Sequence, residues 1–172
     1  MVGNGDPRGQ RELYDRYAPY LSAVASRYLG DSDRVKDVLQ DAFIRIFGNF
    51  GSFRYRGEGS LRAWMSKIVV NGALQDLRRT DRLVRVNELP EPGPDEDPDV
   101  EGVPMDVLQG MIRGLPDGYR TVFNLFVFER MRHKEIAALL GIKENSSASQ
   151  FLRAKALLAK EIKEYRKKND NV

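Results

Sequence analysis

Residues 87–106 most constrain how this chain folds. The strip holds five of the chain's eight prolines and eight acidic residues, and it contains no lysine or arginine. Proline interrupts helices and strands, and neighbouring carboxylates repel one another, so the strip buries too little apolar surface to form a packed element. We interpret it as an extended acidic linker. The chain is therefore expected to form two small domains, over residues 1–86 and 107–172.

The net charge of +3 is the sum of unequal parts. The linker accounts for eight of the 25 Asp and Glu residues, which leaves the two blocks with 28 basic and 17 acidic residues, a net charge of +11. Basic domains are typical of proteins with a polyanionic partner. A merely solvated basic surface is the alternative that composition leaves open.

Composition also excludes several kinds of covalent link, metal site and nucleophile. The chain has no Cys and a single His, which excludes disulfides, thiolate metal sites, iron–sulfur clusters, cysteine nucleophiles and paired-histidine metal sites. No apolar stretch is long enough to span a bilayer, and the first residues lack the pattern of a secretory signal. A cytoplasmic protein without direct membrane insertion is expected.

Apolar residues recur at spacings of three and four in both blocks, and no segment alternates with period two. This periodicity predicts an all-α protein. In the N-terminal block we expect helices from about Leu13 to Tyr28 and from about Val35 to Phe50, with caps for the second at residues 31–33. A Gly-rich loop and a third helix capped by Ser60 follow. In the C-terminal block helices are expected within 107–114, 116–127, 134–140 and 144–167.

The segment His133–Ile142 predicts a helix-turn-helix. Ala137 is small enough for a second helix to approach closely, and Gly141 permits the positive φ of the turn. The second helix would present polar side chains suited to phosphates and base edges. These are Ser146, Ser147, Ser149, Gln150 and Arg153, followed by a basic tail of Lys160, Lys163, Arg166, Lys167 and Lys168. The pattern favours DNA binding over an ordinary helical hairpin.

Two acidic residues mark a second candidate surface. Asp37 and Asp41 lie one turn apart, beside Gln40, on a predicted helix. The N-terminal block offers no further ligands at a matching spacing, so no metal site and no cofactor are expected. A solvated acidic face and a docking surface for a basic partner helix remain equally open.

A third candidate surface follows the Gly-rich loop. Lys67, Asn71 and Gln75 form a polar stripe at intervals of four, with Arg78, Arg79 and Arg82 just beyond. Together with Phe53 and Tyr55 of the loop, this surface suits unstacked bases, because aromatic rings stack on them. A solvated face over a core Trp64 is the alternative. Residues 56–60 lack the Gly-Lys-Ser/Thr of a phosphate loop, so nucleotide hydrolysis is not expected.

Taken in order, these segments resemble the extracytoplasmic-function (ECF) sigma factors of bacterial RNA polymerase. The matching stretches are residues 12–19, residues 37–43, Trp64 with Asn71 and residues 76–79, and Leu115-Pro116 followed by the helix-turn-helix. The resemblance implies sigma region two in the N-terminal block and region four in the C-terminal block. It implies a non-enzymatic factor that directs core polymerase to −35/−10 promoters and helps to open the −10 element.

The resemblance also implies roles for particular residues. Asp37, Gln40, Asp41 and Phe43 would dock on the β′ clamp helices, with the β flap as a second contact of the polymerase. Phe53, Lys67, Asn71, Gln75, Arg78 and Arg79 would bind the −10 element. Ser146, Ser149, Gln150, Leu152 and Arg153 would read the −35 element. Promoter DNA and an anti-sigma factor are implied as further partners, without a small-molecule substrate, and the acidic linker would pass through the polymerase.

Three residues of the recognition helix depart from the family pattern. Ala148 stands where many relatives have Lys or Arg, Ser147 where many have Val, and Asn145 in place of a common Gly. The first change removes a basic contact to DNA. The main alternative function is a helix-turn-helix regulator that binds duplex DNA without polymerase. A small metal-dependent or nucleotide-hydrolysing enzyme would need ligands that the sequence lacks.

Overall fold

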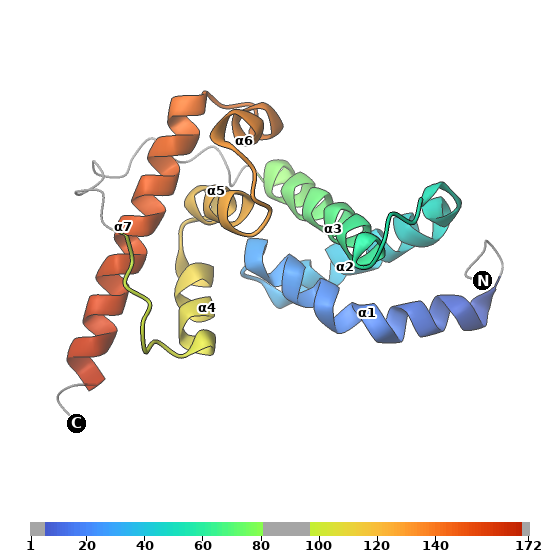
Figure 1. Ribbon diagram of the computed structural model, residues 1–172, viewed down its shortest axis with the longest axis horizontal. Helices are drawn as coiled ribbons and strands as arrows, with labels where there is room; N and C mark the ends of the chain where they lie inside the picture. Colours follow the sequence, from blue (N-terminus) through green and yellow to red (C-terminus); the bar gives the residue numbers. More distant parts are fainter. Residues whose placement is uncertain (1–5, 81–96, 170–172) are drawn as a thin grey trace. The chain divides into compact units, whose positions relative to one another are not determined.

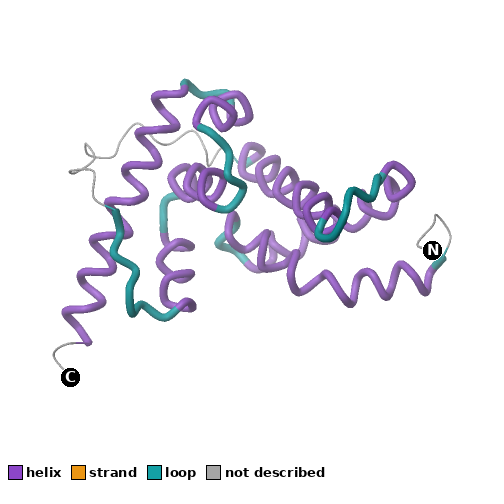
Figure 2. The backbone as a smooth tube through the Cα atoms, in the orientation of Figure 1, coloured by secondary structure: helices purple, strands orange, loops and turns teal. Residues whose placement is uncertain are grey.

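The computed structural model describes residues 6–80 and 97–169. These residues form seven α-helices and one short 3₁₀ turn, and they contain no strand (Figures 1 and 2). The all-α prediction is confirmed. The chain divides into two compact units, Met1–Thr80 and Asp81–Val172. Within the described ranges, no helix is both long and apolar enough to cross a bilayer.

The N-terminal unit is a three-helix arrangement. It comprises α1 (Pro7–Tyr28), α2 (Ser32–Asn49), the 3₁₀ turn η1 (Phe50–Ser52) and α3 (Ser60–Arg79). The apolar stripes of the three helices meet in a core in which Leu21, Val24, Tyr28, Ile46, Met65, Val69 and Leu77 are fully buried. The cap predicted for α2 is confirmed, since Asp31 Oδ1 accepts a hydrogen bond from the backbone N–H of Asp33 at 2.8 Å.

The predicted cap of α3 is wrong in its details. Gly59, with φ of 81°, occupies the N-cap position, and Ser60 is already the first helical residue. The hydroxyl of Ser60 donates to the carbonyl of Gly57 at 2.7 Å and accepts from the backbone N–H of Arg56 at 3.2 Å. Ser60 therefore closes the Gly-rich loop, and the left-handed turn at Gly59 sets the start of α3.

The C-terminal unit contains the helix-turn-helix. Its helices are α4 (Met105–Gly114), α5 (Asp117–Val127), α6 (His133–Leu140) and α7 (Glu144–Asn169). The turn between α6 and α7 is built as predicted: Gly141 has φ of 69°, and the N–H of Ile142 donates to the carbonyl of Ala137 at 3.1 Å. Tyr119, Val122, Leu125, Ile136, Leu158 and Ile162 form the buried interior.

The end of the acidic strip packs on α7. Residues 87–96 lie outside the described residues, but the chain from residue 97 runs beside α7 before α4 begins at Met105 (Figure 1). Lys155 Nζ donates to Asp97 Oδ1 at 2.8 Å, and Arg166 Nη1 donates to Asp99 Oδ2 at 2.7 Å. The hydrogen bond from Arg166 lowers the pKa of the Asp99 carboxyl below its ordinary value. Residues 97–101 therefore lie against the C-terminal unit.

Candidate polymerase-docking and nucleic-acid surfaces

An acidic face lies on the outer side of α2. Asp37, Gln40 and Asp41 are all exposed, as the periodicity of the helix predicts. Ile44 follows at three residues from Asp41 and four from Gln40, which places it on the same face, and its side chain is 64% exposed. We call these four residues the α2 face. Ile44 is not among the contact residues predicted from the sequence, although its spacing from Gln40 and Asp41 indicates that it shares their face.

Phe43 does not belong to this exposed surface. Its side chain is buried, and its ring centroid lies 4.6 Å from that of Tyr14 and 5.6 Å from that of Phe47. A buried aromatic residue stabilises the helix from beneath and leaves the contact surface to its exposed neighbours. Ile44 is therefore the exposed large apolar side chain beside the acidic residues.

The polar stripe of α3 is exposed along its length. Lys67, Asn71 and Gln75 face outward as predicted, as do Arg78 and Arg79; Arg82 lies outside the described residues. We call these five described residues the α3 stripe. Two residues of the stripe form hydrogen bonds with neighbouring side chains. Arg45 Nη2 donates to Gln75 Oε1 at 3.2 Å, and Arg79 Nη2 donates to Asp76 Oδ1 at 3.0 Å.

Asp76 fixes the end of α3 against α2. Its other carboxylate oxygen accepts from Arg34 Nε at 2.8 Å, and Arg34 also donates to the Thr80 hydroxyl at 3.1 Å. Only 11% of the Asp76 side chain is exposed. Ion pairs that are partly removed from water hold geometry better than pairs on an open surface. The Arg34–Asp76 pair therefore holds the end of α3, and Arg79, whose side chain is 81% exposed, meets Asp76 at the surface.

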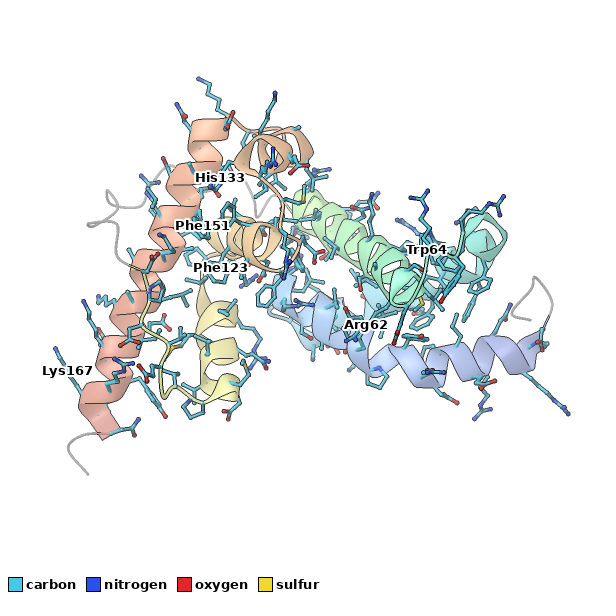
Figure 3. All side chains as sticks on the ribbon, viewed as in Figure 1. Arg62, Trp64, Phe123, His133, Phe151 and Lys167 are labelled. Carbon is cyan, nitrogen blue, oxygen red and sulfur yellow. The ribbon has the colours of Figure 1, made fainter. Side chains whose placement is uncertain are left out.

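The loop aromatics have different environments. Phe53 is half-buried, with its ring centroid 5.3 Å from Trp64 and 6.1 Å from Phe50. Trp64, labelled in Figure 3, completes this cluster with an edge contact to Phe50. Tyr55 is 74% exposed. Of the two residues predicted to stack on bases, Tyr55 has an exposed ring, whereas Phe53 is half-buried against other aromatic side chains.

The recognition helix turns some of its predicted contact residues inward. Ser146, Ser149, Leu152 and Arg153 are partly exposed, but Ser147 is fully buried and Gln150 is 7% exposed. The expectation that α7 presents Ser147 and Gln150 is wrong. Both lie on the stripe that continues through Ala154 and Leu158 into the core of the unit, at the three- and four-residue spacing of one helical face.

Ser147 joins the two helices of the motif. Its hydroxyl lies 3.0 Å from Nδ1 of His133, the first residue of α6, and a hydrogen bond connects them. The imidazole ring stacks on Phe126 at 4.7 Å between centroids, and its centroid lies 5.7 Å from that of Phe151. His133 and Phe151 are labelled in Figure 3. Ser147 therefore has a structural role, because its hydroxyl pairs with a histidine whose ring lies against two aromatic rings.

We expect Ser147→Val to lower the free energy of unfolding by about 1–2 kcal/mol, because it leaves His133 Nδ1 without its buried partner. Replacing both partners by apolar residues, in His133→Phe with Ser147→Val, should recover most of the loss. Urea denaturation of the two single variants and the double variant measures the coupling energy. Additive effects would show that the hydrogen bond contributes nothing.

Across residues 6–80 and 97–169, no three Asp, Glu or His side chains gather in a geometry that holds a metal ion. The surfaces of interest are instead an acidic helix face, a basic polar stripe and a helix-turn-helix. An all-helical protein with these three features in two units has the architecture of a DNA-binding protein that also docks on a protein partner.

Comparison with known proteins identifies the family. The model of sigma-70 region 2 matches residues 13–83, and the model of sigma-70 region 4 matches residues 105–158. The chain belongs to the ECF sigma factors of bacterial RNA polymerase.

Individual relatives cover most of this chain. The ECF RNA polymerase sigma factor SigE of Mycolicibacterium smegmatis is 30% identical over 86% of this chain, which spans 59% of that relative's length. The ECF RNA polymerase sigma factor SigW of Bacillus subtilis is 25% identical over 95% of this chain and 94% of its own length. The solved structure of the sigma factor RpoE of Bartonella quintana, in complex with the anti-sigma factor NepR, shares the fold with a TM-score of 0.52 and 19% identity, over 89% of this chain and 96% of that chain.

Proposed function

We propose that this chain is a promoter-specificity subunit of RNA polymerase, which recruits the core enzyme to a −35/−10 promoter and carries out no covalent chemistry. The observation that carries the proposal is that the N-terminal unit bears two surfaces of opposite charge. The α2 face is acidic with one exposed apolar residue, and the α3 stripe is basic and rich in amides. A factor that binds both a protein and nucleic acid through 80 residues needs such a division.

The α2 face would dock on the β′ clamp helices of the core enzyme. Asp37 and Asp41 supply negative charge for a basic partner, and Gln40 supplies an amide that both donates and accepts hydrogen bonds. Ile44 would supply the desolvated apolar contact that typically dominates binding energy at an interface. The C-terminal unit would make the second contact, with the β flap. As a polymerase subunit in a bacterium, the protein would act in the cytoplasm.

The α3 stripe and the loop would bind the −10 element. Lys67, Arg78 and Arg79 suit backbone phosphates, and Asn71 and Gln75 suit the edges of unpaired bases. Tyr55 and Phe53 would supply aromatic surface for bases that leave the stack. Helix α3 is held at both ends, by the Gly59 turn and by Asp76, so these groups are preorganised.

The exposed side of α7 would read the −35 element through Ser146, Ser149, Leu152 and Arg153, with Gln150 beneath them. We expect Arg153→Ala to weaken binding of the holoenzyme to a −35-dependent promoter by about 1–3 kcal/mol. Electrophoretic mobility shift with reconstituted holoenzyme measures the loss, and a promoter with a scrambled −35 element serves as the control. Equal losses on both promoters would remove Arg153 from sequence recognition.

An anti-sigma factor is proposed as a regulatory partner, since the related Bartonella quintana structure contains one. The proposal as a whole is tested by mixing the chain with core polymerase and separating the mixture by gel filtration. Co-elution as a stoichiometric complex is the expected result. Failure to co-elute, together with tight duplex binding by the free chain, would instead identify a helix-turn-helix regulator that acts without polymerase.

A further inference from the structure

Arg45 lies on the docking helix but reaches toward the α3 stripe. It is exposed, and its guanidinium donates to Gln75 Oε1 at 3.2 Å across the groove between α2 and α3. The helices can approach closely here because residue 72 is glycine: a Cβ at Gly72 would lie 3.3 Å from Val38 Cγ1. The residues that line this groove include Asp41, Arg45, Gly72 and Gln75.

The bond to Arg45 changes what Gln75 can recognise. A free glutamine side chain both accepts and donates, which suits an adenine edge. In this protein Arg45 Nη2 already donates to Oε1. The Nε2 amide group has no partner among the described residues. The pair therefore presents mainly donors, which suit phosphate oxygens and the acceptor atoms of bases.

Arg45 also separates opposite charges. Asp41 lies one helical turn before it, on the α2 face, and lines the same groove. A phosphate near Gln75 would meet the field of this carboxylate across a short gap unless a cation stood between them. Arg45, which lines this groove together with Asp41 and donates to Gln75, supplies that cation.

We propose that Arg45 belongs to the DNA-binding surface of this protein and forms a donor pair with Gln75. In this pair Arg45 holds a phosphate of the single-stranded −10 element. Gln75 Nε2 donates to an acceptor atom of an adjacent unpaired base. This inference rests on the proposed function and deepens it, because it assigns to nucleic acid a residue of the helix that carries the polymerase contact.

Binding of holoenzyme to fork-junction DNA with a single-stranded −10 segment tests the proposal. Arg45→Ala should weaken binding about tenfold, and the slope of log K against log salt should become shallower by about 0.7, the value for one phosphate contact on a single strand. Arg45→Lys should keep the salt slope but reduce discrimination among bases at the position that Gln75 contacts, since an ammonium group cannot hold the amide as the guanidinium fork does. Affinity for core polymerase should stay unchanged in both variants.

Lys36→Ala is the matched control. Lys36 is exposed on the same helix, nine residues away and thus on the opposite side, and its removal takes away the same charge. The proposal is overturned if Arg45→Ala and Lys36→Ala bind the fork with equal affinity and salt slope. It is also overturned if Arg45→Ala instead weakens binding to the core enzyme. Failure of the unaltered chain to form a holoenzyme would reject the proposed function itself, and that outcome is visible before any variant is compared.

Discussion

Changing Asp41 to lysine is expected to reduce the affinity of the chain for core polymerase about a hundredfold, while the chain keeps its fold. Asp41 is exposed, and no hydrogen bond or ion pair ties it to the described part of the chain. Its substitution therefore leaves the interior of the unit unchanged. At the interface the variant replaces an attraction by a like-charge contact, which costs several kcal/mol, and a hundredfold loss corresponds to about 2.7 kcal/mol.

Surface-bound core polymerase, titrated with each variant, measures this effect. Asp15→Lys makes the same charge change on an exposed position of α1 and serves as the control. It should bind within about twofold of the unaltered chain, as expected for a surface substitution away from the contact. Equal affinities for Asp41→Lys and Asp15→Lys would mean that the α2 face is a solvated surface and that the docking site lies elsewhere.

Replacing Arg120 by alanine is expected to unfold the C-terminal unit alone. Arg120 is 4% exposed; it donates to the carbonyl of Arg113 at 2.8 Å and of Leu115 at 3.0 Å, and it pairs with Asp117. Removing one member of a buried ion pair costs about 3–5 kcal/mol, because the remaining charge loses its partner in a desolvated site. A unit of this size has little stability beyond that. The lost carbonyl contacts also release the junction between α4 and α5.

The single tryptophan makes this effect easy to assign. Trp64 lies in the N-terminal unit, so its fluorescence follows that unit, whereas far-ultraviolet circular dichroism follows all helices. In urea, Arg120→Ala should lose part of the dichroism at low denaturant while the Trp64 transition stays in place. Arg113→Ala is the control, because it removes an exposed arginine seven residues earlier and keeps the backbone carbonyl to which Arg120 donates. Coincident shifts of both signals in Arg120→Ala would show that the two units unfold together.

Sequence periodicity predicted the helices because each has a regular apolar face. The stripe from Leu13 to Tyr28 needs only spacing to be recognised, and Asp31 and Gly141 are local signals whose effect depends on the residues next to them. The acidic face of α2 and the stripe of α3 were predicted for the same reason. Once the apolar face of a helix is known, the position of each residue around the helix axis predicts whether its side chain is exposed.

The features that the sequence did not predict depend on contacts between residues far apart in the sequence. Ser147 and Gln150 are polar, and only the packing of α7 on α5 and α6 shows that they face inward. The pairs Arg45–Gln75 and Arg166–Asp99 span 30 and 67 residues, and no local pattern indicates them. The acidic strip was predicted as an extended linker from composition, but composition does not reveal that Asp97 and Asp99 find cations on α7.

Promoter-dependent run-off transcription tests the central claim most directly. Core polymerase would be incubated with a linear template that carries an ECF-type −35/−10 promoter, with and without this chain. A run-off product of defined length that appears only when the chain is present, and that disappears with the Asp41→Lys variant, is the predicted result. No product from any such promoter, with a core enzyme that is active with another sigma factor, would contradict the account.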